Sequence, residues 1–452
     1  MTPSPLDLSV GQQALWLQYR LAPDSAAYND AGALLLRPRP DVAALNRAVR
    51  AVLDRHDLLR SRFVEHAGQP GRVVDAPGRS VLQVRDVAGV DDRALHAMAR
   101  QVCTAPFRLD ADGPFRVVLL RREADAVLVV VTHHIATDAQ SQRIVWRDLM
   151  AAYRSTVHGT PTQWPQLTAT FDDYVRREHE LLSSPRGAEF ARYWEGLCRG
   201  ARAATLPTDR PRPATPAFAG ATRRRPVPAE LADRVRAAAS AASCTPFALL
   251  LGAFHATLHR YTGQADLTVG VPASTRRVRP LRDLVGLLVN TIVVRADFTP
   301  WTTLGDTVGA LNRQLADSLR RVTYPYAHLG VGHGREPLFR TAITMVKLAA
   351  DEPLPDGRDG SVETFGFRAQ RLDVPQLEGQ LDLTVEVTHR PDGLSLEFRY
   401  DTELFDADTV DRLVDHYLRV VDLTCRRPGE RVVGISLIDT DELSRLLAIG
   451  SG

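Results

Sequence analysis

The chain has 452 residues, 44% of them hydrophobic, and its 56 basic and 54 acidic side chains leave a formal charge of +2. About two domains are expected at this length. No apolar run approaches the roughly 18 to 20 residues that a membrane span needs, and the N-terminus lacks the basic and apolar regions of a signal peptide. We therefore expect a cytoplasmic protein that does not bind a membrane.

Composition also argues against nucleic-acid and metal binding. The basic residues are dispersed along the chain, with no aromatic side chains interleaved among them, which is not typical of a nucleic-acid surface. The cysteines lie far apart and form no C-x-x-C pair, so neither a zinc knuckle nor a disulfide framework is predicted. We interpret all four as packing or surface thiols: Cys103, Cys198, Cys244 and Cys425.

The predicted elements of the first half begin with a helix and a hairpin. In residues 42–53 the apolar positions follow the helical spacing, which predicts an amphipathic helix with one buried stripe. Residues 114–120 and 126–133 are two strand-like runs joined by the charged R-R-E-A-D, and together they predict a hairpin. Apolar residues with helical spacing return at 144–153, so a second helix is expected there.

The second half repeats this plan after a proline-rich segment. Residues 206–228 are dense in proline and polar side chains, which predicts a crossover between two lobes. A helix pair at 230–261 and further strands follow, without a residue-level repeat. We predict an α/β (two-layer α+β) fold with an N-terminal lobe over 1–178, a crossover over 179–228 and a C-terminal lobe over 229–452.

Residues 127–141 read V-L-V-V-V-T-H-H-I-A-T-D-A-Q-S, so a uniform apolar run ends in two adjacent histidines. The run itself predicts a strand that is buried on both faces. Successive side chains on a strand point to opposite faces, so His133 and His134 cannot both enter one cavity. One of them is expected to face a possible site and the other to pack in the interior.

Three other interpretations of the histidine pair are weaker. A metal site needs converging ligands, whereas neighbouring strand histidines diverge and no further cluster of cysteine, histidine or carboxylate stands nearby. A pair of hydrogen-bonded core histidines is a second possibility. A hydrolase needs an activated serine or cysteine, and the chain has no G-x-S-x-G elbow. A histidine that acts directly on a nucleophile supplied by a substrate fits better.

With Asp138, the stretch is similar to the H-H-x-x-x-D-G signature of the condensation domains of nonribosomal peptide synthetases. Seven further segments resemble the other motifs of this family in the family's order, so the resemblance covers almost the whole chain. They are L-S-V-G-Q-Q-A-L-W with A-P-D-S-A-A-Y-N (8–16 and 22–29), R-H-D-L-L-R-S-R-F (55–63), F-D-D-Y-V (171–175), L-P-T-D-R-P-R-P (206–213), V-G-L-L-V-N-T-I-V-V-R (285–295), E-P-L-F (336–339) and Y-D-T-E-L-F (400–405).

This resemblance implies two chloramphenicol acetyltransferase-like lobes in a V-shaped pseudo-dimer with a central tunnel. Donor and acceptor carrier proteins would dock at the tunnel mouths, each with its substrate on a phosphopantetheine arm, and the domain itself would bind no cofactor and no metal. It would join a donor acyl thioester to an acceptor amine as an amide. A monomer is expected, with neighbouring synthetase domains as further partners.

The resemblance also implies roles for the motif residues. His134 would face the tunnel as the catalytic histidine, and His133 would be its packing or orienting partner. Asp138 would be mainly structural and would pair with Arg276. General chemistry supports these roles, since a neutral imidazole that handles the proton of an attacking amine typically contributes about 10² to 10⁴ in rate. A carboxylate just past a buried strand also requires a paired cation.

Four further candidates are classed as substrate-binding or structural: Ala139, Ser141, Arg276 and Asn290. Ala139 replaces the glycine of the signature, and an alanine is strained there if the position needs a positive φ. Its backbone N–H stays available to a developing oxyanion in either case. Asn290 either serves the lobe interface or stabilises a turn. The segment before E-P-L-F is shortened relative to the family, which alters the expected tunnel wall or acceptor side.

The functional hypothesis is amide formation between carrier-bound substrates in nonribosomal peptide or hybrid polyketide-peptide biosynthesis. One alternative is an acyltransferase of the same fold that forms an ester or amide on a soluble acceptor. Another is a non-catalytic platform that recruits a partner enzyme. Relatives of that last kind tend to lose the second histidine, which this chain keeps as His134.

Overall fold

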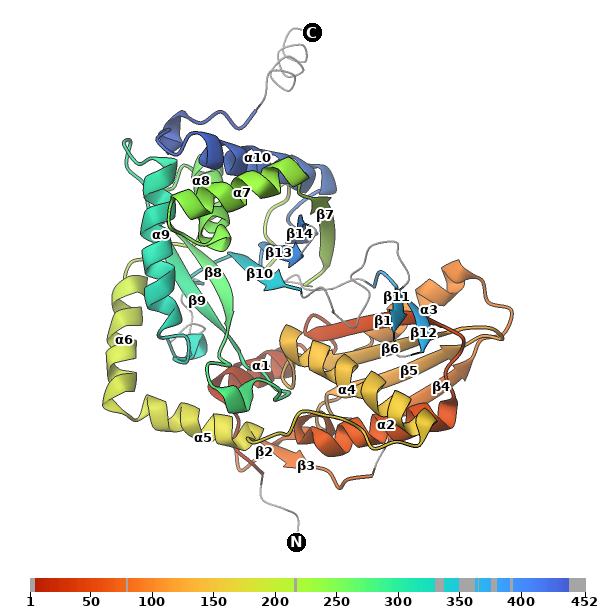
Figure 1. The fold of residues 1–452 in the computed structure, drawn as a ribbon. Coiled ribbons are helices and arrows are strands. Elements are labelled where there is room, and N and C mark those ends of the chain that lie inside the picture. The colour runs from red at the N-terminus through yellow and green to blue at the C-terminus, as the bar shows by residue number, and fades with distance from the viewer. Residues whose placement is uncertain are drawn as a thin grey trace.

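Two α/β lobes lie side by side in the computed structural model (Figure 1). It describes residues 5–78, 80–214, 218–329, 337–348, 362–364, 366–374, 380–390 and 393–438. Each lobe is built on one six-stranded sheet, and a small two-stranded ribbon stands apart from both. The α/β fold class predicted from the sequence is confirmed.

The sheet of the first lobe has the strand order β11-β12-β1-β6-β5-β4. Its strands from the first half of the chain are β1 (Asn29–Arg37), β4 (Leu82–Asp86), β5 (Phe115–Arg121) and β6 (Ala126–His133). β5 and β6 pair antiparallel from Phe115 opposite Thr132 to Arg121 opposite Ala126, so the predicted hairpin is confirmed. The separate ribbon consists of β2 (Ser61–His66) and β3 (Gln69–Val74).

Helices cover both faces of this sheet, and β6 is therefore buried along its whole length. The side chains of Val127, Val129 and Val131 pack on the face that carries α3 (Asp92–Thr104). Leu128 and Val130 pack on the opposite face, against α2 (Val42–Arg55) and α4 (Ala139–His158). The alternation deduced from the apolar run is thus visible in the two cores.

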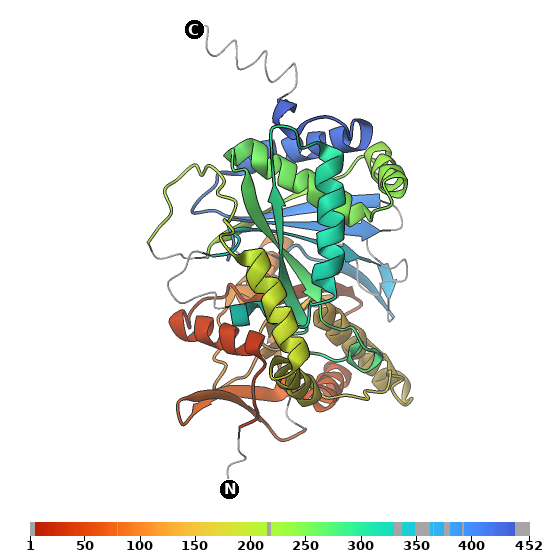
Figure 2. The same ribbon diagram turned by 90° about the vertical axis from the view of Figure 1, so that its left-hand side faces the viewer.

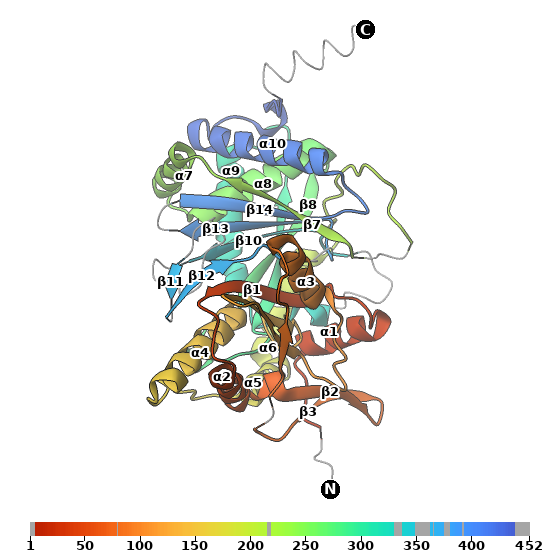
Figure 3. The same cartoon turned by 90° about the vertical axis from the view of Figure 1, so that its right-hand side faces the viewer.

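Two strands of the first sheet come from the second half of the chain. β11 (Val362–Thr364) and β12 (Phe367–Arg371) form a hairpin, and β12 pairs antiparallel with β1 from Leu34 to Arg37 (Figure 3). The hairpin covers an edge of the first sheet that would otherwise expose unpaired backbone groups. The lobe boundary predicted at residue 229 does not account for these two strands, which follow it in the chain but join the sheet of the first lobe.

The sheet of the second lobe has the order β7-β14-β13-β10-β8-β9. Its strands are β7 (Gly220–Pro226), β8 (Asp266–Ser274), β9 (Val289–Asp297), β10 (Thr341–Lys347), β13 (Leu383–Arg390) and β14 (Gly393–Asp401). A single large core joins the sheet to its helices. These are α7 (Ala229–Ala241), α8 (Pro246–Thr262), α9 (Leu304–Leu319) and α10 (Ala407–Arg426). α7 and α8 are the predicted helix pair.

Two helices connect the lobes along one side of the molecule (Figure 2). α5 (Phe171–Leu182) has the capping box of Thr170 and Asp173 at its start. α6 (Pro185–Cys198) begins with a proline at N1 after Ser184. Phe190 and Trp194 of α6 belong to the core of the second lobe. Part of the segment predicted as a crossover is therefore a packed helix.

The loop between β8 and β9, residues 275–288, reaches from the second lobe into the first. Three leucines of this loop pack in the core on the α3 face of the first sheet, and Val285 packs in the core on the opposite face. The leucines are Leu281, Leu284 and Leu288. A short 3₁₀ helix, Arg279–Leu281, lies within it. This loop carries Arg276 to the end of β6, and it is called the β8–β9 loop below.

None of the helices in the described part of the chain is both long and apolar enough to cross a membrane by itself. α7 and α8 satisfy length and composition only when taken together, and they are bent by 103° relative to each other. The four cysteines are unpaired, and Cys103 is buried.

Candidate active site

The histidine motif forms a tight loop between β6 and α4. His133 is the last residue of β6, and α4 begins at Ala139. Asp138 is the N-cap of α4, where its side chain accepts a hydrogen bond from the N–H of Ser141 at 2.8 Å. The backbone N–H of His134 donates to the carbonyl of Tyr28 at 2.8 Å. Both ends of the loop are therefore fixed by secondary structure.

His133 packs in the interior. Its side chain lies among the rings of Tyr19, Tyr28 and Phe107, and the residue is 3% exposed. Its Nδ1 accepts the N–H of Ile135 at 3.1 Å, which leaves the ring proton on Nε2. Burial, and secondarily the neighbouring His134, lowers the pKa of His133 to about 3. The ring is neutral at physiological pH.

Removal of this ring should destabilise the protein in a pH-dependent way. We expect His133→Ala to lower the free energy of unfolding by about 1 to 3 kcal/mol at neutral pH, because the Ile135 N–H loses its buried acceptor. The folded-state pKa lies below the ordinary value, so the wild-type stability due to neutral His133 is full above about pH 6.5 and falls as the pH drops towards 3. The difference between variant and wild type should therefore shrink in acid.

Thermal melts of both proteins at neutral pH and at about pH 5 test this expectation. His66→Ala, which changes an exposed histidine at the end of β2, serves as the control and should melt close to the wild type at both pH values. A difference between His133→Ala and wild type that grew on acidification would contradict it.

His134 differs from its neighbour in exposure and in its ring hydrogen bond. The residue lies in the turn after β6 and is partly exposed. Its Nδ1 lies 2.5 Å from the carbonyl oxygen of Thr137, so Nδ1–H donates and the lone pair is on Nε2. The backbone of the loop thus sets opposite tautomers in the two histidines. Only His134 presents a proton-accepting nitrogen that is not already used.

Asp138 and Arg276 form a bidentate ion pair across the two lobes. The distances are 2.6 Å from Nη1 to Oδ2 and 3.0 Å from Nη2 to Oδ1, and both side chains are 4% exposed. Asp138 Oδ2 also accepts the N–H of Leu288 at 2.9 Å. Every carboxylate oxygen is therefore hydrogen-bonded, as a buried charge requires.

Ser141 completes the junction between α4 and the β8–β9 loop. Its Oγ lies 2.7 Å from Arg276 Nη2, accepts the N–H of Gly286 at 3.0 Å and donates to the carbonyl of Gly286 at 2.8 Å. The predicted candidates Asp138, Ser141 and Arg276 thus lie together in one buried network. The network ties the first turn of α4 to the second lobe.

Ala139 occupies its position without strain. It is the first helical residue of α4, it is exposed, and it does not have a positive φ. An L side chain is therefore accommodated, and the strain considered for a glycine-to-alanine change does not arise here.

Comparison with known proteins places this geometry in a family. A model of the condensation domain matches residues 5–447. The chain belongs to the condensation-domain family. Phosphinothricin tripeptide synthetase PhsC of Streptomyces viridochromogenes is 30% identical over 462 residues, which cover 99% of this chain and 42% of PhsC. This condensation domain thus spans less than half of that synthetase.

Solved structures show the same fold. The X-domain from teicoplanin biosynthesis is 25% identical, with a TM-score of 0.86 over 97% of this chain and 99% of the other; an X-domain of that biosynthesis is also known in complex with OxyB. The first condensation domain of the calcium-dependent antibiotic synthetase, in complex with a substrate analogue, is 21% identical, with a TM-score of 0.76 over 97% and 100% of the two chains.

The side chain of Asn290 forms none of its described hydrogen bonds with the histidine loop of this condensation domain. Its Nδ2 donates to the carbonyls of Val322 and Tyr324 at 2.8 and 2.6 Å, and its Oδ1 accepts the N–H of Tyr326 at 2.9 Å. Every polar atom of the side chain thus stabilises the turn before the 3₁₀ helix Tyr326–Leu329. Of the two roles considered for Asn290, these contacts favour turn stabilisation.

Two positioning residues of the condensation domain were not singled out in the sequence. Gln12 of α1 (Val10–Leu21) is fully buried, and its Nε2 donates to the carbonyl of Ile135 in the histidine loop at 2.9 Å. Glu178 of α5 accepts the N–H of Val10 at 2.7 Å, and burial raises the pKa of its carboxyl. The sequence motif at residues 8–16 includes Gln12, but its contact with the histidine loop can be identified only from the structure.

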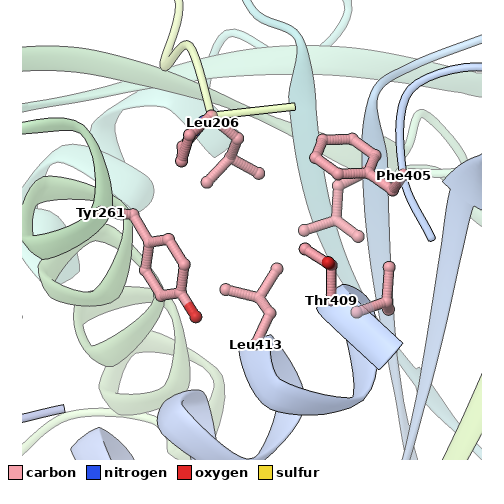
Figure 4. Close-up of a pocket in the computed structure, with 8 residues that line it drawn as sticks. Leu206, Tyr261, Phe405, Thr409 and Leu413 are labelled. Carbon is pink, nitrogen blue, oxygen red and sulfur yellow. The ribbon is translucent and has the colours of Figure 1, made fainter. Parts of the chain in front are cut away.

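Two small cavities lie among the described residues of the condensation domain. One lies in the second lobe, with Leu206, Tyr261, Phe405 and Leu413 among its apolar lining (Figure 4). Its volume is about 10 Å³, which leaves room for one water at most. Among the described residues no group of three or more histidine, cysteine or carboxylate side chains could hold a metal ion.

Proposed function

We propose that this domain condenses a carrier-bound acyl thioester with a carrier-bound amine to form an amide. Condensation domains of nonribosomal peptide synthetases are amide-forming acyltransferases at the family level, and the match over residues 5–447 supports that class for this chain. The observation that carries the proposal is the ring of His134, whose Nε2 lone pair is kept free because Nδ1–H donates to the carbonyl of Thr137.

In the proposed reaction the amine nitrogen attacks the thioester carbonyl. The C–N bond forms, the C–S bond breaks, the donor acyl group moves to the amine, and the sulfur of the donor's phosphopantetheine arm leaves as a free thiol. Nε2 of His134 accepts the proton that the amine loses and returns it to the departing sulfur. A thioester is already activated, so holding the reactants in attack geometry could supply up to about 7 to 11 kcal/mol of the acceleration.

The junction of Asp138, Ser141 and Arg276 would keep the histidine loop in register with the second lobe. Its ion pair is buried and bidentate, and such a pair has one favoured geometry. The proposed tunnel between the lobes, with carrier proteins at its two mouths, would deliver both pantetheine arms to this loop. Donor, acceptor and neighbouring domains belong to the proposal, since the chain spans 42% of PhsC.

We expect amide formation by this domain to depend on carrier proteins. Carrier proteins loaded with a panel of aminoacyl and fatty-acyl thioesters would be mixed in pairs with the domain, and mass spectrometry would follow both arms. We expect an amide on the acceptor arm and a free thiol on the donor arm. The same acyl groups on small thioesters should react far more slowly, because remote binding energy is lost. Equal turnover with small thioesters and free amines would instead indicate an acyltransferase for soluble acceptors.

One observation favours a second candidate, a platform that recruits a partner enzyme. The likeness to the X-domain from teicoplanin biosynthesis reaches a TM-score of 0.86 at 25% identity. An X-domain of that biosynthesis was solved in complex with OxyB. Binding of this chain to OxyB, measured by titration, together with no amide from any loaded pair, would replace the condensation proposal with the platform. Retention of His134 argues for catalysis.

A further inference from the structure

We propose that the side chains of Thr137, Thr132 and Gln142 act as a positioning chain that sets the ring tautomer of His134. The inference rests on the proposed function, because it concerns the histidine to which proton transfer is assigned there. It goes beyond that function in naming residues that the histidine signature does not specify. Thr137 acts through its own carbonyl group, so it is a positioning residue.

The chain of contacts starts on α4 and ends in the histidine loop. Gln142 Nε2 donates to the carbonyl of Asp30 at 2.6 Å and to Thr132 Oγ1 at 2.8 Å. Thr132 Oγ1 and Thr137 Oγ1 lie 2.6 Å apart. Thr137 Oγ1 also lies 3.4 Å from the carbonyl oxygen of His133. Three elements, β6, its loop and α4, are thereby joined through side chains.

The directions of these hydrogen bonds follow from the donors available. The amide of Gln142 must point its NH₂ group at Asp30, because a carbonyl oxygen only accepts. Thr132 Oγ1 therefore accepts from Gln142 and has its own hydrogen free for Thr137. Thr137 Oγ1 accepts that hydrogen and donates to the carbonyl of His133. In this arrangement each of the two threonine hydroxyls donates one hydrogen bond and accepts one.

The residues of this hydrogen-bonded chain are buried, so their partners cannot be replaced by water. Thr132 and Thr137 are both 0% exposed, and Gln142 is 7% exposed. Water cannot take the place of a lost partner at a fully buried hydroxyl, so every break in the chain leaves a donor or acceptor unsatisfied. The side chain and the carbonyl carbon of Thr137 are both bonded to its Cα, so anchoring the hydroxyl restricts where that carbonyl can lie.

That carbonyl is the acceptor for His134 Nδ1–H at 2.5 Å. If it turns away, nothing in the described contacts of the ring favours Nδ1–H over Nε2–H, and a mixture of tautomers is expected, as in a free imidazole. Molecules with the proton on Nε2 cannot accept the amine proton there. The hydroxyl chain should therefore act on the rate through the tautomer of His134.

Ring ¹⁵N signals of histidine test the tautomer without any substrate. The full chain, labelled in its 13 histidines, is measured at about pH 8, where an ordinary histidine is neutral, and the signal absent from His134→Ala identifies the ring. We expect one tautomer, Nδ1–H, in the wild type and a mixture in Thr137→Val, which replaces the hydroxyl by a methyl group. Thr137→Ser keeps the hydroxyl and should restore the single tautomer.

Two further variants make the result specific. Thr132→Val interrupts the chain one residue earlier and should give the same mixture, so the test does not depend on the folding of one variant. Thr257→Val removes a buried hydroxyl of α8 that donates to Ala253 at 2.8 Å and should leave His134 unchanged. A single Nδ1–H tautomer in folded Thr137→Val or Thr132→Val would overturn the proposal.

Single-turnover amide formation separates this inference from the function on which it rests. With a loaded carrier pair that gives product, Thr137→Val should be slower by the factor by which the Nδ1–H population falls, which is about twofold for an even mixture of the two tautomers. A mixed tautomer with an unchanged rate would uphold the positioning chain and contradict the proton-transfer role of His134. A slower rate with the wild-type tautomer would overturn the chain.

Discussion

His134→Ala should leave a folded protein that forms amide about 10² to 10⁴ times more slowly in a single turnover. The reason is local: the partly exposed ring holds its lone pair on Nε2, and no other described hydrogen bond depends on the ring except the one to Thr137. The side chain borders solvent, so its removal creates no closed cavity. Thermal melts and amide formation with the same loaded carriers measure the two effects.

The matched control for this prediction is His158→Ala, the same substitution at an exposed position on the helix that follows the loop. It should change neither the melt nor the rate. A near wild-type rate for His134→Ala would mean that positioning of the reactants alone supplies the acceleration. A large loss of stability would mean that His134 is structural.

The facing of the two histidines could be predicted from the sequence because it depends on the two-residue period of a strand. The odd positions 127, 129 and 131 pack on one face, and His133 follows them into that core. His134 leaves the strand and becomes partly exposed. The opposite facing of the two histidines is predictable because the side chains of a strand alternate between its two faces along the whole apolar run.

The exchange of β11 and β12 could not be predicted in the same way. The hairpin lies more than 300 residues from β1 in the chain, and its pairing with Leu34–Arg37 satisfies a sheet edge rather than a local pattern. Residues 330–335, which belong to the segment that the sequence suggested is shortened before E-P-L-F, lie outside the described residues, as does Glu336 of that motif. Long-range pairing of this kind leaves no periodic signal in either segment.

The surroundings of the site were only partly predictable for a related reason. Charge burial required a cation for Asp138, and family resemblance pointed to Arg276, but the contributions of Ser141 and Gly286 depend on the path of the β8–β9 loop. Likewise, a buried Gln12 contacts the histidine loop from 123 residues away. Short polar side chains such as Thr132 and Thr137 acquire a role only when the fold buries them together.

Asp138→Ala should lower the free energy of unfolding by about 3 to 5 kcal/mol and abolish most activity. The substitution leaves Arg276, whose side chain is 4% exposed, without its carboxylate, and an uncompensated buried charge costs this much. It also removes the N-cap of α4, worth about 1 kcal/mol. Asp138→Asn also removes the charge but keeps a capping oxygen. The difference in unfolding free energy between the two variants therefore measures the contribution of the cap.

A bidentate ion pair on the surface provides the control for Asp138. Asp86 and Arg121 also form two hydrogen bonds, at 2.5 and 2.9 Å, but their side chains are 66% and 32% exposed. Solvent screens such a pair, so Asp86→Ala should melt close to the wild type. Replacing both partners in the double variant Asp138→Leu/Arg276→Met should recover part of the stability, because no unpaired charge remains. If Asp138→Ala melted normally yet formed no amide, the carboxylate would have to act on the reacting groups themselves.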